Sequence, residues 1–257
     1  MRRLWMSLLL VPVMVAAVAS AAWASPATSA GRSAPAARTA PAARAAAAQA
    51  LQPGMKGSAV KALQRRLAAL KYYPGSIDGR FGTNTLEAVW AFYEAQGMTP
   101  HSYVSKAMKW RLAHPRAPKV LVKHGAANRI EVSLSREILV LYRNNKVQLI
   151  SHVSTGGHYY YCSPGGGCGY AVTPTGNFRT VVFMRGWVHV PLGEMFNPVF
   201  FIGTAFAIHG DTDVPLAPVS HGCVRIPMDI AAFFHKLVHV NEQKGTPIYI
   251  RGRVPGT

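Results

Sequence analysis

Two hydrophobic periodicities divide the chain after its first 50 residues. Between residues 51 and 114, apolar residues such as Val60, Leu63 and Leu67 recur every three or four positions, the spacing of one helix face. From residue 119 onward the period changes to two, as at Ile130 and Val132, which is typical of strands. The pattern therefore predicts a multidomain protein, with a small helical domain at 51–114 and a mostly-β domain at 119–252.

The first domain is expected to be a compact three-helix bundle, because about 60 residues can bury only a small core. Ser58 is a plausible N-cap for the first helix, which Pro74 and Gly75 follow. A second helix is predicted from about Asn84, with Asn84 and Glu87 at the spacing of a capping box. A third is expected at 105–112. The predicted apolar face of the second helix consists of Leu86, Val89, Trp90 and Tyr93.

The second domain is predicted to be a mostly antiparallel β-structure with one late helix. Its first strands lie within residues 129–156, where Asn144 and Asn145 predict a hairpin turn. Only residues 228–238 have a helical pattern in this domain. Further strands are expected within 176–184, 187–192, 199–210 and 246–252.

The first 50 residues are predicted to be a secretory signal and a linker. Arg2 and Arg3 precede an uncharged apolar run, and small residues at Ala22 and Ala24 fit a signal-peptidase site, so we expect cleavage after Ala24. An uncleaved membrane anchor is the alternative, since the apolar run is nearly long enough to span a bilayer. Residues 25–50 lack large apolar side chains and are expected to form a disordered linker.

The charge indicates a polyanionic partner outside the cytoplasm. The formal net charge is +18, and cleavage of the signal would leave 26 basic and 10 acidic residues. Export makes nucleic acid an improbable partner, whereas a bacterial envelope rich in carboxylates and phosphates fits a basic surface. We therefore expect a cell-wall or periplasmic protein that contacts anionic wall polymers and has no stable membrane span after cleavage.

The chain has three cysteines, so at least one is unpaired within it. Cys162 and Cys168 bracket the sequence SPGGG, whose proline and glycines allow a tight loop. The short spacing and the exported location favour a disulfide between them, with two reduced thiols in a mobile loop as the alternative. If they pair, Cys223 is the free thiol.

A nucleophilic role for Cys223 is favoured by its neighbours in the segment AIHGDTDVPLAPVSHGCVRIP. His221 lies two residues earlier, which on a strand would place both side chains on one face. His209 is predicted at the end of a strand. Gly210 and Gly222 would allow a substrate to approach the backbone closely, and the amides around Gly222 and Cys223 are candidates for an oxyanion hole.

Two other interpretations of these residues stay open at this point. His209, His221 and Cys223 could be zinc ligands, with Asp211 or Asp213 completing the site. Paired elements such as C-x-x-C, which most closed zinc sites show, are missing from the sequence. The other alternative is a buried cysteine beside a core histidine. We predict no metal and no cofactor.

Residues 51–113 resemble the peptidoglycan-binding domain that accompanies many wall-modifying enzymes. The run DGxFGxxTxxAVxxF, from Asp78 to Phe92, carries this resemblance. It implies non-catalytic docking on the glycan or the stem peptides of the cell wall. As an independent docking unit, this domain could be deleted without loss of chemistry on soluble wall fragments.

Residues 119–252 resemble the catalytic domain of the L,D-transpeptidases. The motif AIHG, followed after ten positions by SHGCVR, carries this resemblance, with TPTGNF in the expected order. The resemblance implies that Cys223 is the nucleophile, that His209 is the general base, and that the Gly210 carbonyl holds the imidazole tautomer. It also implies that His221 and Ser220 shape the pocket.

The same resemblance leaves the substrate contacts less defined. Arg225 would either fix the loop or meet a substrate carboxylate, and a salt bridge is an equal alternative. The insertion that contains Cys162 and Cys168 has no counterpart in the family pattern. We expect it to form part of a lid, with Tyr159–Tyr161 and Tyr170 as candidate substrate contacts, Tyr160 and Tyr170 foremost.

The implied reaction is the formation of 3→3 cross-links between peptidoglycan stem peptides. In it, the thiol takes the acyl group of a tetrapeptide stem as a thioester, and the side-chain amine of a second stem resolves it. Carbapenem-type β-lactams would then acylate Cys223. An L,D-carboxypeptidase that uses water as acceptor is the nearest alternative, and a non-catalytic wall-binding protein is another.

Overall fold

The computed structural model describes residues 50–254. The predicted signal segment and all but the last residue of the predicted linker lie outside the described residues. Among the described helices, none is long and apolar enough to cross a membrane. The described helices are α2 (Ser58–Ala69), α3 (Thr83–Ala95), α4 (Lys106–Ala113) and α5 (Met228–Phe234).

The helices form where their periodicity predicts them, but two of the predicted caps are wrong. Gly57, with φ of 125°, is the N-cap of α2, so Ser58 is already helical. Gly82 is the N-cap of α3, and neither cap supplies a side-chain hydrogen bond. The predicted capping box fails because the N-cap of α3 is Gly82, two residues before Asn84, and the Glu87 side chain is buried. Ser105 does cap α4, accepting a hydrogen bond from the Met108 amide at 3.0 Å.

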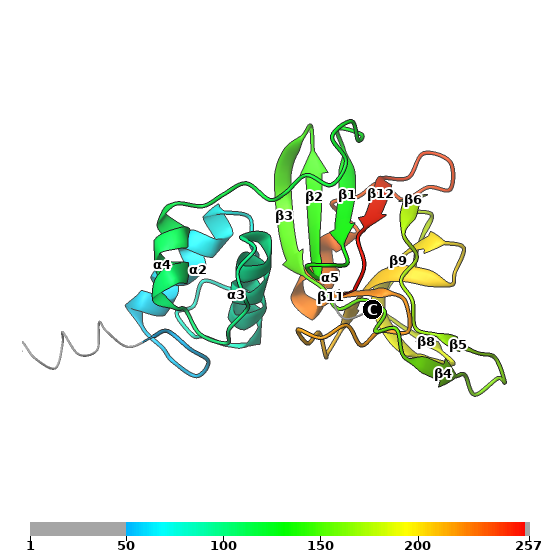
Figure 1. Ribbon diagram of the computed structural model, residues 1–257, viewed down its shortest axis with the longest axis horizontal. Helices are drawn as coiled ribbons and strands as arrows, with labels where there is room; N and C mark the ends of the chain where they lie inside the picture. The colour runs from blue at the N-terminus through cyan, green and yellow to red at the C-terminus, as the bar shows by residue number, and fades with distance from the viewer. Residues whose placement is uncertain (1–49, 255–257) are drawn as a thin grey trace, which may run out of the picture. The chain divides into compact units, whose positions relative to one another are not determined.

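The β-domain contains two five-stranded sheets and a separate hairpin (Figure 1). The first sheet has the order β3-β2-β1-β12-β6, and the second has β11-β10-β9-β7 with β8 paired to β9. All pairs are antiparallel except β1 with β12 and β10 with β11. The strands are β1 (Arg129–Ser133), β2 (Ile138–Arg143), β3 (Lys146–His152), β4 (Tyr160–Cys162), β5 (Cys168–Tyr170), β6 (Gly176–Arg179), β7 (Val182–Phe183), β8 (Trp187–Val190), β9 (Gly193–Ile202), β10 (Phe206–Asp211), β11 (Val224–Pro227) and β12 (Pro247–Arg251).

Local turn chemistry sets two of the connections. Asn144 and Asn145 have φ of 50° and 58° and join β2 to β3, which confirms the predicted hairpin. Residues 199–210 are not one continuous strand, because Gly203 has a φ of 49° and the chain turns between β9 and β10. The late helix is shorter than predicted and ends at Phe234, followed by turns.

The first sheet is covered on both faces, which explains why β2 is almost continuously apolar. Val140 and Tyr142 belong to the same core cluster as helices α2, α3 and α4. Leu139 and Leu141, which alternate with them, point into the core between the two sheets. One hydrophobic core is thus shared by the helices and the β-domain, so the helices are not separated from the β-domain by solvent.

Several carboxyl groups are buried around this shared core. Burial raises the pKa of Glu87, Glu94 and Glu137 to about 7, and that of Asp229 to about 6. A carboxyl whose pKa is raised on folding binds its proton more tightly in the folded state, so stability is lost as the pH rises through the raised pKa.

We therefore expect the thermal unfolding midpoint to be lower at about pH 8 than at about pH 5, by several degrees. The lowered pKa values of His209, His221 and His235 act in the opposite direction, but the latter two side chains are largely solvated and contribute little. The raised pKa of His152 acts in the same direction as the four carboxyls. Differential scanning calorimetry across this pH range measures the slope. Glu87→Gln should flatten it and Glu194→Gln, at an exposed position, should not; a midpoint that rises with pH would contradict the prediction.

Candidate active site

Strands β10 and β11 bring His209 and Cys223 to one face of the second sheet. In their parallel register, Ile208 lies opposite Val224 and His209 lies opposite Arg225. Ile208 and Val224 point into the main β core, so the alternating residues His209 and Cys223 belong to the other face. Consistent with this, Cys223 packs against the separate small cluster that contains Ala207. Cys223 immediately precedes β11, so the thiol and the imidazole of β10 lie on the same face of the sheet, diagonally across from one another.

The His209 ring is held in one tautomer. Its Nδ1 lies 3.0 Å from the carbonyl oxygen of Gly210, which can only accept, so Nδ1 carries the hydrogen. Burial lowers the pKa of His209, so the ring is neutral at neutral pH and Nε2 has a free lone pair. Gly210 also has to be small, because a Cβ there would lie 2.7 Å from Cβ of Ala231.

Cys223 is the free thiol among the described cysteines. Its Sγ accepts a hydrogen bond from the Ala207 amide at 3.4 Å. Burial raises the pKa of Cys223, while this amide and the positive charge of Arg225 act against that rise. The resting group is therefore a thiol, and its conversion to a nucleophile needs a proton acceptor such as a neutral imidazole.

The chain reaches Cys223 through a tight turn and not through a strand. His221 lies in this turn, which corrects its predicted place on a strand beside Cys223. Gly222 has a φ of 141°, and a Cβ there would lie 2.8 Å from the carbonyl oxygen of Val172. Gly222 is thus required by close approach of the protein's own backbone. Ser220 Oγ donates to the Cys223 carbonyl at 2.6 Å and accepts from the Gly222 amide at 2.8 Å.

This turn changes two expectations from the sequence. The Gly222 amide already has a partner in Ser220, so it could serve an oxyanion hole only by breaking that hydrogen bond. Ser220 is buried and holds the backbone of the turn, so it shapes the site from within and does not line its surface.

Arg225 forms a salt bridge within the chain. Its Nε lies 3.1 Å from Oδ2 of Asp211, and its NH1 group donates to the Asp213 carbonyl at 3.3 Å. Of the alternatives left open by the sequence, the structure therefore shows the salt bridge, and the bond to the Asp213 carbonyl joins Arg225 to the start of the β10–β11 loop as well. The sequence did not predict that Asp211 is the partner of Arg225. The position of Asp211 at the end of a predicted strand could have suggested it.

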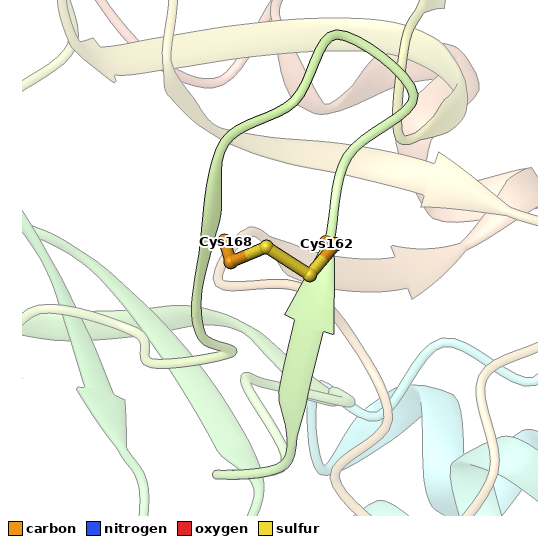
Figure 2. Close-up of a disulfide and its surroundings, with 2 residues drawn as sticks. All are labelled: Cys162 and Cys168. Atoms are coloured by element: carbon orange, nitrogen blue, oxygen red, sulfur yellow. A yellow bond between two sulfur atoms is a disulfide. The ribbon is translucent and has the colours of Figure 1, made fainter.

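The insertion between β3 and β6 is a two-stranded hairpin closed by a disulfide. Cys162 and Cys168 lie opposite one another on β4 and β5, with an S–S distance of 2.05 Å (Figure 2). Tyr160 and Tyr170 form a cross-strand pair on the same hairpin, two positions from the disulfide. Their ring centroids are 5.4 Å apart, and both side chains are more than 60% exposed.

The opposite face of this hairpin contacts the turn that precedes Cys223. The ring centroids of Tyr161 and Tyr159 lie 4.6 and 5.6 Å from that of His221, and Tyr159 Oη donates to the Val219 carbonyl. Alternation along the strand explains why Tyr160 faces away from them. Of the four candidate tyrosines, Tyr159 and Tyr161 therefore lie against the turn, whereas Tyr160 and Tyr170 pair with one another on the exposed face of the hairpin.

The described residues contain no cluster of three or more His, Cys, Asp or Glu side chains that could hold a metal ion. The zinc interpretation has a further difficulty, because Asp211 is occupied by Arg225 and His209 Nδ1 by a carbonyl. A thiol beside a neutral imidazole of fixed tautomer is suited to acyl transfer.

Two family models match the chain. Residues 127–250 match the family model described as the L,D-transpeptidase catalytic domain, and residues 56–107 match that of a peptidoglycan binding domain. The search of curated proteins found no match.

Solved structures similar to this chain include the L,D-transpeptidase from Xylanimonas cellulosilytica. It is 30% identical, with coverage of 79% of this chain and 98% of that one and a TM-score of 0.72. An L,D-transpeptidase from Stackebrandtia nassauensis is 19% identical, with coverage of 82% and 100% and a TM-score of 0.45. The match at 30% identity spans both kinds of domain and nearly all of the relative's length. On that match, the chain belongs to the L,D-transpeptidase family.

Proposed function

We propose that this protein joins peptidoglycan stem peptides by 3→3 cross-links, with Cys223 as the nucleophile and His209 as the general base. The observation that carries the proposal is that a free thiol, just before β11, lies on the same sheet face as the neutral imidazole of β10. The fixed Nδ1 hydrogen leaves Nε2 as the proton acceptor. Family membership supports peptidoglycan as the substrate.

The reaction balances in two steps. As Sγ attacks the carbonyl carbon of the third stem residue, its proton passes to His209 Nε2 and the sulfur–carbon bond forms. The bond to the terminal D-Ala then breaks, and its amine leaves with the proton from the imidazolium. An amine of a second stem next attacks the thioester, and the carbon–sulfur bond breaks as the new amide bond forms. The proton lost by that amine passes through His209 Nε2 to the departing sulfur.

The helices and the basic charge support a location at the cell wall. The match of residues 56–107 to a peptidoglycan binding domain supports wall recognition by this segment. We propose that residues 1–24 direct export and that the positive charge of the chain adds attraction to anionic wall polymers. Holding the site beside an insoluble substrate raises the effective concentration of stem peptides.

The test is incubation of the purified protein with disaccharide-tetrapeptide, followed by mass analysis of the products. The expected product is a cross-linked dimer with release of D-Ala. Conversion to a tripeptide monomer alone would identify an L,D-carboxypeptidase instead. An unchanged substrate would leave a wall-binding role without this chemistry, and would overturn the proposal.

A further inference from the structure

A buried ion pair joins helix α3 to strand β3. The two carboxyl oxygens of Glu94 lie 2.9 and 3.0 Å from His152 Nδ1, and the two side chains are 6% and 0% exposed. Glu94 belongs to the helices that match a peptidoglycan binding domain, whereas His152 ends a strand of the catalytic domain. The two domains are therefore connected by a specific polar contact inside their shared core.

The second ring nitrogen of His152 faces the loop between β10 and β11. Its Nε2 lies 3.1 Å from the carbonyl oxygens of both Val214 and Pro215. Because a carbonyl oxygen only accepts, Nε2 carries a hydrogen. Nδ1 then shares one further proton with Glu94, either as an imidazolium–carboxylate pair or as a neutral ring beside a carboxylic acid. In both states the ring directs a donor at the loop.

The charges around His152 favour keeping that shared proton. Burial by itself would lower the pKa of His152, but the Glu94 carboxylate, with a smaller contribution from Glu137, raises it. Glu87, on the same helix as Glu94, also interacts with the imidazole through its charge, and Asp229 at the start of α5 interacts in turn with Glu87. The ring of Trp90 packs edge-on against the imidazole at 5.4 Å, which fixes its plane.

The residues after His152 hold the rest of the same loop. Ser154 Oγ donates to the Ala217 carbonyl at 2.8 Å and accepts from the Val219 amide at 3.1 Å. The Thr155 carbonyl accepts from the Ser220 amide at 3.0 Å. Ser220 in turn bonds the carbonyl of Cys223. Residues 152–155 therefore hold the loop at successive points from residue 214 to the turn that ends at the thiol.

We propose that Glu94 and His152 are positioning residues, through which the wall-binding helices hold the β10–β11 loop and so set the place of Cys223. This inference rests on the proposed function of Cys223. Without the Glu94 contact, the His152 ring is free to rotate. Its Nε2 then no longer donates steadily to the carbonyls of Val214 and Pro215, which are the first contacts that hold the loop. Misplacement of a reacting group by about 1 Å can lower a rate by about 10²-fold.

The test compares three variants of the full-length protein. Glu94→Leu removes the acceptor, whereas Glu94→Gln keeps a side chain that can hydrogen-bond to Nδ1 without the charge. Glu87→Leu is the matched control, since Glu87 lies on the same helix with the same burial, at 8% exposure against 7%, and contacts His152 through charge alone. Each variant is measured well below its own unfolding midpoint.

Two measurements separate positioning from a general loss of stability. Hydrogen exchange, followed by mass spectrometry, reports on the amides of residues 212–223 and does not depend on the reaction. Turnover of disaccharide-tetrapeptide gives kcat and KM. We expect Glu94→Leu to speed exchange in this segment about tenfold and to lower kcat about tenfold with little change in KM, as for loss of one charge-assisted hydrogen bond. Glu94→Gln should recover most of both effects, and Glu87→Leu should show neither.

Equal exchange and equal kcat in Glu94→Leu and Glu87→Leu would overturn the inference, as would the absence of any recovery in Glu94→Gln. Failure of the proposed function gives a different result. In that case the wild-type protein produces no dimer, while the exchange of residues 212–223 still separates Glu94→Leu from its control.

Discussion

Cys223→Ala is expected to lower the rate of dimer formation about 10³-fold or more, because it removes the atom proposed to carry the acyl group. Cys223→Ser should be nearly as inactive, since the environment that already raises the pKa of a thiol is still less able to ionise a hydroxyl. The same mass assay on disaccharide-tetrapeptide measures both variants.

The controls for this prediction are folding and wall binding. Cys223 is half-buried at the edge of a small cluster, so its truncation should cost little stability. Binding to purified cell walls should be unchanged, because the matching domain lies at residues 56–107. Cross-linking by Cys223→Ala at an undiminished rate would exclude the thioester mechanism.

Deletion of residues 51–113 is expected to abolish folding of the catalytic domain, contrary to the independent docking unit suggested by the sequence. The deletion would expose Ile138, Val140, Tyr142 and Ile150, which are buried in a common cluster with the helices. At about 1.5–3 kcal/mol for each large apolar side chain, these four account for about 6–12 kcal/mol, comparable to the whole stability of a typical domain.

Thermal unfolding and solubility of the shortened protein measure this effect, together with its turnover of soluble tetrapeptide. A second shortened variant, with polar residues at 138, 140 and 142, serves as the control for the cause. It should recover solubility if exposure of that sheet face is responsible. The first shortened protein, without the polar substitutions, would refute the shared core if it had the same unfolding midpoint and the same turnover of tetrapeptide as the full chain.

The comparison of pattern and structure shows where periodicity is informative. Helical spacing located α2 and α3 to within one or two residues, yet the predicted N-caps Ser58 and Asn84 were wrong. Glycine is also accepted at the N-cap of a helix, and Gly57 and Gly82 occupy these positions. The alternation at Ile130 and Val132 located a strand. It could not show that Glu131, which lies between them on the other face of the sheet, is buried as well. That face is covered by elements distant in sequence, among them the helices.

At the candidate site, residue types were predictable but their partners were not. The sequence placed His209, Gly210 and Cys223 together on the strength of a family motif, and the structure gives the hydrogen bond from His209 Nδ1 to Gly210. The placement of His221 on a strand was wrong, because Gly222 adopts a φ that turns the chain. Its contact with Tyr161 depends on an insertion whose direction no local pattern specifies.

The sequence by itself determined the place of most helices and strands, the presence of at least one unpaired thiol and the chemistry available to Cys223, because these follow from local spacing, residue count and residue type. Tertiary structure alone decided that the helices and the sheet share one core and that Glu94 contacts His152 across 58 positions of the chain. The physical reason is that burial and electrostatic pairing depend on distance in space. Distance in space is set by the packing of whole elements and not by the spacing of residues within one of them.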